Sequence, residues 1–176
     1  LHHPERRDRA GLVGEAHRAP GERAEYSDIG FMVLQWIVER VTGERLDRFW
    51  TEAVVKPLSP GELFFNGQGR PLAAHSFAAT ELCPWRGRLL AGEVHDDNAH
   101  VLGGVAGHAG LFGTAHAIWS LLQGVLSSEL GRTRHALFDR AILNTFFQRQ
   151  FETTWALGFD TPDERGSSSG SHFPKG

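Results

Sequence analysis

Apolar residues recur with helical spacing in the stretch AEYSDIGFMVLQWIVERVTG. Those at intervals of three or four positions, which would form one face of a helix, are Ile29, Met32, Val33, Trp36, Ile37 and Val41. The polar triplet Tyr26-Ser27-Asp28 comes first, and a Ser or Asp side chain can accept hydrogen bonds from the first N–H groups of a helix. Gly43 suits the left-handed residue that ends many helices. The pattern predicts a helix capped by Ser27 that ends at Thr42.

Three further helices are predicted along the chain. One covers residues 46–55 and ends before Pro57, because proline disfavours the helical conformation of its preceding residue. Thr114 is the expected cap of another, whose apolar face is Ile118, Leu121, Leu122, Val125 and Leu126. The last covers residues 136–150, with an inward face made of Leu137, Ala141, Ile142, Thr145 and Phe146.

Strand-like patterns are few. The stretch TTWALGFD, residues 153–160, is the best strand candidate because apolar and small residues alternate in it. Residues 75–85 are expected to hold a short strand, and residues 57–72 are rich in Pro and Gly and predict turns. Irregular structure is expected over 1–23, 86–114 and 161–176. The chain is therefore helix-rich, with too little strand for a complete sheet.

Length and charge narrow the class of protein. The 176 residues suffice for one domain with a core, and the formal net charge of -3 favours neither nucleic acid nor an anionic membrane as partner. The single cysteine, Cys83, excludes an internal disulfide. No apolar run reaches the roughly 18 residues of a membrane span. The chain starts without Met and both ends look like loops, so we expect a fragment of a longer protein.

The stretch GGVAGHAGLFG places five glycines around His108. Glycine permits positive φ and close approach of another backbone or of a ligand. Neither G-x-x-x-x-G-K-[ST] nor G-x-G-x-x-G occurs, which disfavours a nucleotide site. A tightly packed loop and the wall of a pocket both remain open.

Potential metal donors gather just before the glycines, in GEVHDDNAH. His and Asp are common zinc ligands, but no H-E-x-x-H spacing is present, and such side chains in loops are more often solvated or hydrogen-bonded. We therefore predict no metal and no cofactor, and a metal-dependent hydrolase is kept as a weaker alternative. Asp97 and Asn98 suit Asx-type turns, and together with His108 they are candidate pocket residues.

The chain offers no convincing serine nucleophile. S-x-x-K does not occur, and G-x-S-x-G occurs only as the run GSSSG, residues 166–170, in the stretch expected to be a loop, so no nucleophile is predicted among these residues.

The stretch APGERAEYSDIGFMVLQWIVERVTG resembles the second active-site motif of the serine β-lactamase-like family, which includes class C β-lactamases, D-alanyl-D-alanine carboxypeptidases and esterases. Pro20-Gly21, Tyr26-Ser27-Asp28 and Val41-Thr42-Gly43 match it in order and spacing. The stretch GEVHDDNAHVLGGVAGHAGLFGTA looks like a signature of one branch of that family. The resemblance implies an α+β chain, the helix-rich portion of the β-lactamase/penicillin-binding-protein-like fold with an incomplete sheet, as one partial domain over residues 1–176.

The resemblance also assigns roles to two residues. Tyr26 would be the general base or proton shuttle, working with the Lys of an S-x-x-K motif; that motif and a K-T-G or H-T-G strand are expected outside this chain. A phenol with an ordinary pKa of about 10 needs a nearby cation to act as a base near neutrality. Asp28 would face the substrate where many members have Asn. A carboxylate there cannot donate a hydrogen bond unless protonated, which favours an esterase or peptidase over a true β-lactamase.

The resulting hypothesis is part of a serine acyl hydrolase that cleaves a small-molecule ester or peptide through an acyl-enzyme. The segment alone is predicted to be inactive. The alternative is a non-catalytic β-lactamase-like scaffold or binding module. The resemblance implies an extracytoplasmic parent protein.

Overall fold

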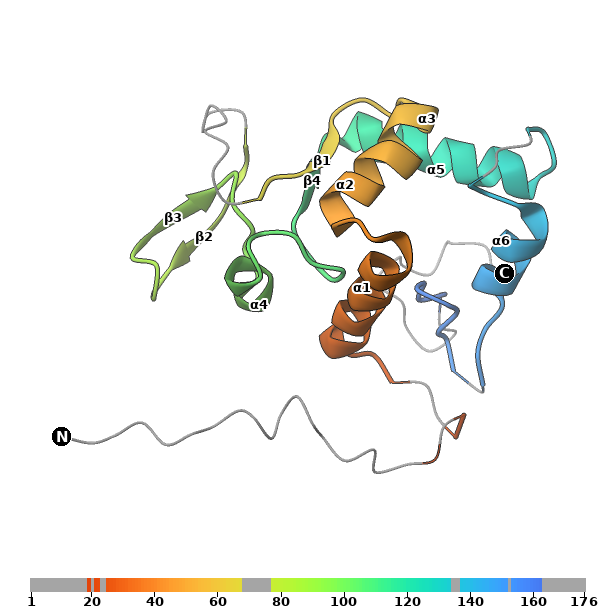
Figure 1. Cartoon of the computed structure of the whole chain (residues 1–176), viewed down its shortest axis with the longest axis horizontal. Helices are drawn as coiled ribbons and strands as arrows, with labels where there is room; N and C mark the ends of the chain where they lie inside the picture. The colour runs from red at the N-terminus through yellow and green to blue at the C-terminus, as the bar shows by residue number, and fades with distance from the viewer. Residues whose placement is uncertain are drawn as a thin grey trace. The chain divides into compact units, whose positions relative to one another are not determined.

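The computed structural model describes residues 19, 21–22, 25–67, 77–133, 137–151 and 153–162. They fall into two compact units: the first combines residues 1–29 with residues 141–176, and the second is residues 30–140 (Figure 1). The loops predicted over 1–18 and 163–176, and Pro20 of the Pro-Gly pair, lie outside the described residues. The expectation of one domain over the whole chain stays a prediction.

The first predicted helix is confirmed as α1, Asp28–Thr42. It ends as expected at Gly43, whose φ is 72° and whose N–H donates to the Glu39 carbonyl at 2.9 Å. The predicted inward face is wrong, because Trp36 and Val41 are 63% and 80% exposed. The half-buried edge that packs includes Phe31 and Gln35 instead.

The second predicted helix continues further than expected. Leu46–Trp50 forms α2, Thr51–Val55 forms the π-helical turn η1, and Lys56–Leu58 forms α3, with Pro57 inside the helical run. The predicted stop before Pro57 is therefore wrong. The wider π turn ends two residues before this proline, which has no N–H to donate. The run ends at Ser59, a left-handed residue with φ of 45°.

Two separate two-stranded antiparallel sheets lie in the second unit. In the first sheet, β1 (Leu63–Phe65) pairs with β4 (Leu111–Gly113), and Phe64 opposes Phe112. In the second, β2 (Ala79–Cys83) pairs with β3 (Arg88–Ala91). The strand expected within residues 75–85 is confirmed. Three of these strands were expected to be turns or irregular, because strands of three or four residues are too short to show a period.

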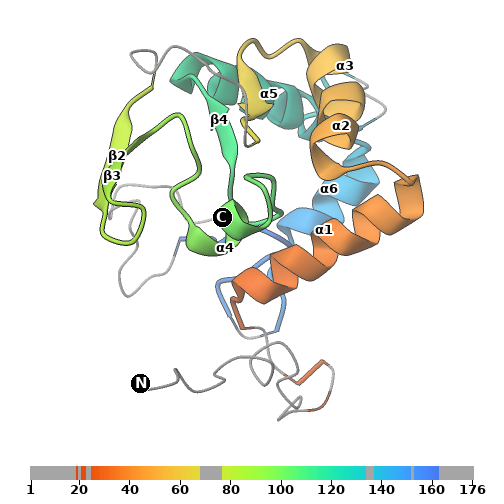
Figure 2. The ribbon, with the colours of Figure 1, turned by 60° about the vertical axis from the view of Figure 1, so that its left-hand side comes forward.

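The small core of the second unit gathers around α4, Asp97–Val101, a helix in the stretch expected to be irregular. Val94, Ala99 and Ala106 form a buried cluster against which Ala109 packs. Figure 2 shows the β2–β3 hairpin on one side of this unit and α1, α2 and α3 on the other, with the chain after α4 running between them. Ala106 and Ala109 belong to the glycine-rich stretch, so the cluster packs that stretch against α4.

Thr114 caps α5, Ala115–Glu129, as predicted: its hydroxyl oxygen accepts from Ala117 N–H at 3.1 Å. The predicted apolar face is only partly correct. Ala117 and Ser128 are buried, whereas residues expected to face inward are about half exposed, namely Ile118, Leu122 and Leu126. Burial on α5 follows the small residues, which allow close approach of neighbouring segments.

Two predictions for the last part of the chain are corrected. The helix is α6, Arg140–Phe147, shorter than the predicted 136–150, and its buried residue is Leu143 rather than the expected face. The stretch TTWALGFD is a tight turn with one antiparallel bridge between Trp155 and Asp160, not a strand. Gly158, with φ of 82°, permits this reversal.

The chain is thus α+β, with helices and small antiparallel sheets, as the sequence predicted. Among the described residues, no helix combines the length and apolar character that a membrane crossing requires.

Candidate functional site

Two residues of the polar triplet at the start of α1, Tyr26 and Asp28, are hydrogen-bonded to each other. The Tyr26 hydroxyl donates to Asp28 Oδ1 at 2.8 Å, and the Tyr26 ring stacks on Trp155 with centroids 5.5 Å apart. Tyr26 is 55% exposed. Tyr26, Asp28 and Trp155 all belong to the first unit. The two residues that the sequence assigned to chemistry therefore contact each other directly.

The residues of the Tyr26-Ser27-Asp28 triplet occupy different positions relative to the start of α1. Asp28 is the first helical residue, where a carboxylate is favoured by the positive end of the helix dipole. Ser27 directly precedes it, in the position of a cap, and its capping role stays a prediction. The roles of Tyr26 as base and Asp28 as substrate contact stay predictions as well.

The glycine-rich stretch makes the close backbone approaches that its composition predicted. A Cβ on Gly107 would collide with the Phe31 carbonyl, and one on Gly113 would lie 2.7 Å from the Glu62 carbonyl oxygen. Gly107 N–H donates to Gln35 Oε1 at 3.0 Å, and Gln35 Nε2 donates to Val105 O at 3.3 Å. Gln35 thus joins the middle of α1 to this loop through both ends of its amide.

His108 is held from the other side by α4. Its side chain is 2% exposed, and Nε2 lies 2.8 Å from Asp96 Oδ1. Asp96 also caps α4 by accepting from Ala99 N–H at 2.8 Å. Because the carboxylate can only accept, Nε2 carries the proton and a neutral ring has its lone pair on Nδ1. Nδ1 is buried and has no partner among the described residues.

Opposing influences set the pKa of Asp96. Partial burial raises it, but the hydrogen bonds from Ala99 N–H and His108, together with the attraction of His108, bring the pKa below its ordinary 3.8. The carboxylate is therefore ionised at neutral pH and acts as a fixed acceptor for His108.

Asp97 and Asn98 serve another part of the unit. Asp97 Oδ1 accepts from Trp85 Nε1 at 2.8 Å and from Arg86 Nη2 at 3.0 Å. The Arg86 side chain is 3% exposed and also donates to the Val94 carbonyl at 2.7 Å. Asn98 is an exposed residue of α4. This arrangement ties α4 to the β2–β3 hairpin, and neither Asp97 nor Asn98 lies beside His108 in a pocket.

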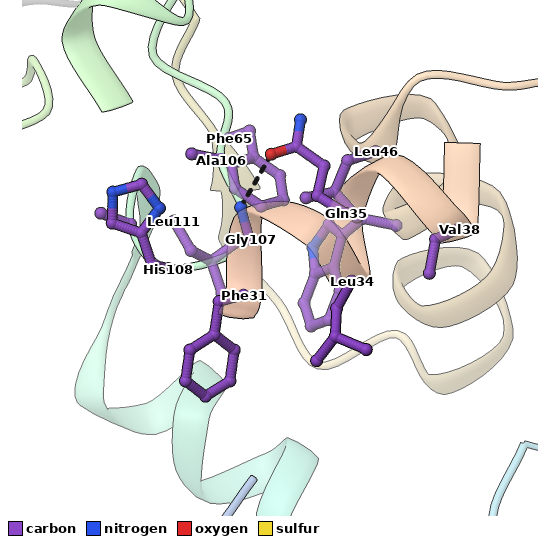
Figure 3. Close-up of a pocket in the computed structure, with 12 residues that line it drawn as sticks. Phe31, Leu34, Gln35, Val38, Leu46, Phe65, Ala106, Gly107, His108 and Leu111 are labelled. Carbon is purple, nitrogen blue, oxygen red and sulfur yellow. Dashed lines mark hydrogen bonds between the residues drawn. The ribbon is translucent and has the colours of Figure 1, made fainter. Parts of the chain in front are cut away.

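A pocket of about 360 Å³ lies between α1, α2, β1 and the glycine-rich stretch, and its lining residues all belong to the second unit (Figure 3). Its walls include Phe31, Leu34, Gln35, Val38, Trp50 and His108. Of the three candidate pocket residues, only His108 lines it. Gly107 also lines it, so the loop is both tightly packed and a pocket wall, and the two interpretations that the sequence left open hold together.

The histidines near α4 have separate partners. His95 lies 3.5 Å from Glu81, the His100 ring packs edge-on against Trp85, and His108 binds Asp96. In the part of the chain that the structure describes, no three His, Cys, Asp or Glu side chains converge as a metal site would require. The donor-rich stretch is used for structural contacts.

Three contributing residues did not stand out in the sequence. Asp96 had a local signal, since Asp three positions before Ala99 is a capping arrangement. Gln35 had none, because its partner Gly107 is 72 positions away. Arg86 was one of many scattered arginines, and its role depends on the turn after β2 meeting residues 93–97.

Comparison with known proteins connects these features to a family. The model of the family described as beta-lactamase matches residues 8–175. Proteins named "Putative D-alanyl-D-alanine carboxypeptidase" from Salmonella agona, Salmonella typhi and Salmonella schwarzengrund are each 35% identical over 153 residues, which is 80% of this chain. The match covers 35% of each relative, so the chain spans about a third of their length. No solved structure matches significantly.

Proposed function

Because this chain belongs to the beta-lactamase family, we propose that it is part of a serine hydrolase that cleaves an ester or amide bond through an acyl-enzyme. The observation that carries the proposal is the family match over residues 8–175. The name shared by the Salmonella relatives supports an amide or peptide bond as one substrate class. In this proposal the nucleophilic serine comes from a part of the parent protein outside these 176 residues.

Tyr26 is the proposed proton acceptor for that serine. A phenol oxygen that donates its own hydrogen to a carboxylate keeps its lone pairs available as acceptors. The 2.8 Å hydrogen bond to Asp28 supports this role, since it orients the hydroxyl and gives its proton a partner. When the serine attacks, its proton passes to the Tyr26 oxygen while the phenol's own hydrogen moves to Asp28 Oδ1, and the two transfers reverse as the leaving group takes a proton from Tyr26. When the acyl-enzyme is hydrolysed, the same relay takes the proton of the attacking water and returns it to the serine oxygen.

Asp28 then has two proposed contributions. It holds the phenol hydroxyl, and its second carboxylate oxygen remains an acceptor for an N–H or O–H of the substrate. Because an ionised carboxylate cannot donate to a substrate carbonyl, this supports an ester or peptide substrate more than a β-lactam.

The test uses the intact parent protein with a chromogenic ester. Tyr26→Phe removes only the hydroxyl and keeps a ring to stack on Trp155, so we expect normal folding and a kcat lowered roughly 10²–10⁴-fold. Trp155→Phe is the matched control, because it alters the stack and retains the hydroxyl; we expect a much smaller loss of kcat. Wild-type turnover in Tyr26→Phe would end the catalytic assignment and favour a scaffold or binding role.

A further inference from the structure

Tyr26 lies at a place in the chain where a side chain has freedom to move. It precedes the first helical residue of α1 and is 55% exposed. Its hydrogen bond to Asp28 reaches two positions along the chain, and the net contribution of such a bond is small because water competes for both partners. A misplacement of about 1 Å in a catalytic site can cost roughly 100-fold in rate. A proton acceptor in this position therefore depends on a further contact to fix its ring.

The Trp155 ring supplies such a contact within the first unit. The planes of the Tyr26 and Trp155 rings are 26° apart and their centroids are separated by 5.5 Å, the geometry of an offset-stacked aromatic pair. A phenol held against a flat ring cannot leave its rotamer without losing the stack, so fewer side-chain conformations are open to it. Trp155 thus restricts the ring of Tyr26, and Asp28 orients its hydroxyl.

Trp155 is suited to support another ring because its own backbone is fixed. Its carbonyl oxygen accepts from Gln150 N–H at 2.7 Å, and its N–H donates to Thr153 Oγ1 at 3.1 Å. It also forms the antiparallel bridge with Asp160, and the next residue, Ala156, is buried. The half-buried Trp155 side chain therefore projects from a segment whose backbone is bonded on both sides of it.

Side chains close the turn that carries Trp155. Thr154 Oγ1 donates to Asp160 Oδ1 at 2.7 Å, and Thr161 Oγ1 donates to the Thr154 carbonyl at 2.7 Å. Arg149 Nε donates in turn to Thr161 Oγ1 at 2.7 Å. A functional side chain is placed accurately when the residues that support it are themselves held by hydrogen bonds. The turn meets this condition on the side of Tyr26 where Trp155 lies.

We infer that Trp155 is a positioning residue for Tyr26: its ring holds the phenol in the rotamer whose hydroxyl reaches Asp28, and the hydrogen-bonded turn keeps Trp155 in place. The inference rests on the proposed function and adds a residue to that same site. Trp155 acts through Tyr26 rather than on the substrate. Its loss should therefore lower kcat and leave KM unchanged, since a raised KM with unchanged kcat reports a lost contact with the substrate.

Kinetics of the intact parent protein with a chromogenic ester tests this split. Trp155→Leu should lower kcat about 3–10-fold, because the stacking preference of an aromatic pair shifts a conformational equilibrium by up to about that factor. Trp155→Phe keeps an aromatic ring and should restore most of the kcat. Phe159→Leu is the matched control, since it removes a ring of the same turn that packs on Phe147, and it should turn over as wild type. A raised KM with unchanged kcat in Trp155→Leu would make Trp155 a substrate contact and overturn the inference.

A double-mutant cycle tests whether Trp155 acts through the Tyr26 hydroxyl. That hydroxyl is absent from Tyr26→Phe, so adding Trp155→Leu to this variant should cause no further loss of kcat. A merely structural role of Trp155 would lower kcat by the same factor in both backgrounds, and that additivity would refute the inference while the role of Tyr26 stands. Wild-type turnover in Tyr26→Phe would remove the proposed role of Tyr26 and the inference with it.

Near-ultraviolet circular dichroism examines the stack without catalysis. Coupled rings contribute a signal that either Tyr26→Leu or Trp155→Leu removes, so the change in the double variant should be smaller than the sum of the two single changes. Strictly additive changes would show that the rings do not stack in the parent protein and would overturn the inference. If the parent protein hydrolyses neither esters nor peptides, the proposed function fails, and the spectra still decide whether Trp155 holds the Tyr26 ring.

Discussion

Individual residues at two positions determine how the glycine-rich stretch is held. Gly107 lies against the backbone of α1, and Asp96 binds both the start of α4 and the buried His108. Each position depends on a property that few residues share: the lack of a Cβ in one case and a short side chain with two acceptor oxygens in the other. Substitutions there should therefore have effects that the surrounding sequence does not suggest.

Gly107→Ala should destabilise the chain. The added Cβ would meet the Phe31 carbonyl, and a backbone atom cannot move aside cheaply, so we expect a loss of about 1–3 kcal/mol in the free energy of unfolding. Gly30→Ala is the control: it lies in α1 with nothing within 4 Å of the added Cβ, and alanine favours the helix by roughly 0.8–1 kcal/mol. Urea denaturation measures both. Equal effects of the two substitutions would contradict the close contact.

Asp96 should make stability depend on pH in the acid range. Its pKa in the folded chain lies below the ordinary 3.8, so the ionised form stabilises the fold. This contribution is complete above about pH 4 and is lost as pH falls through the lower, folded-state pKa. Asp96→Asn removes the charge but can still cap α4. The difference in unfolding free energy between wild type and Asp96→Asn should therefore shrink as pH falls below 3.8.

Asp96→Ala separates the charge from the cap. It removes the acceptor of Ala99 N–H and leaves buried His108 without a partner, so at neutral pH it should be less stable than Asp96→Asn by at least about 1 kcal/mol. Denaturant titrations at a series of pH values measure both variants. A constant gap between wild type and Asp96→Asn across the acid range would rule out the charge effect.

Among the elements, α5 shows most plainly that a capping residue determines where a helix begins, whereas the segments packed against the helix determine which of its residues are buried. Thr114 determines where the helix starts, because its hydroxyl oxygen accepts from the first turn. The buried positions are Ala117 and Ser128, although leucines on the same helix are half exposed. Propensity and capping therefore act within the element, whereas burial is decided by what packs against it.

Thr114→Ala should lower the free energy of unfolding by about 1 kcal/mol, because Ala117 N–H loses its acceptor. Thr114→Ser keeps a hydroxyl at the same position and should stay within a few tenths of wild type. Thermal melts followed by circular dichroism measure both. A stable Thr114→Ala with an unshifted midpoint would show that the cap contributes nothing.

For the whole molecule, the exposed apolar surface of the helices has consequences in solution. The α1 residues Val33, Trp36, Ile37 and Val41 are between 43% and 80% exposed. Contiguous apolar patches of this kind mark surfaces that associate with other molecules. The chain, studied by itself, is therefore expected to associate with a partner surface or with itself.

Sedimentation velocity over a concentration series tests this expectation. The wild-type chain should show a sedimentation coefficient that rises with concentration, and Val33→Glu combined with Ile37→Glu should reduce the rise, since charges disfavour burial of the patch. Arg40→Glu changes the charge of the same helix at an exposed polar position and serves as the control. A wild-type coefficient independent of concentration would contradict the prediction.

Much of the fold could be predicted where the signal is local. The span of α1 follows from its periodic apolar residues, its end follows from Gly43, and the start of α5 follows from Thr114. The strands β1 and β4 could not be predicted, because three residues carry no period and their pairing joins positions about 50 apart. The apparent strand TTWALGFD failed because Gly158 allows a reversal inside it.

In the candidate site, too, local features could be predicted from the sequence and long-range contacts could not. The sequence alone determined the Tyr26-Ser27-Asp28 triplet at a helix start, the family it resembles, and the need for glycine beside His108, since each depends on residue type and short spacing. Only the tertiary structure decided that Gln35 binds the glycine-rich stretch, that Asp96 rather than Asp97 holds His108, and that an apolar pocket forms against α1. These contacts join residues that are distant in the chain, and the packing that selects among them is a property of the folded molecule.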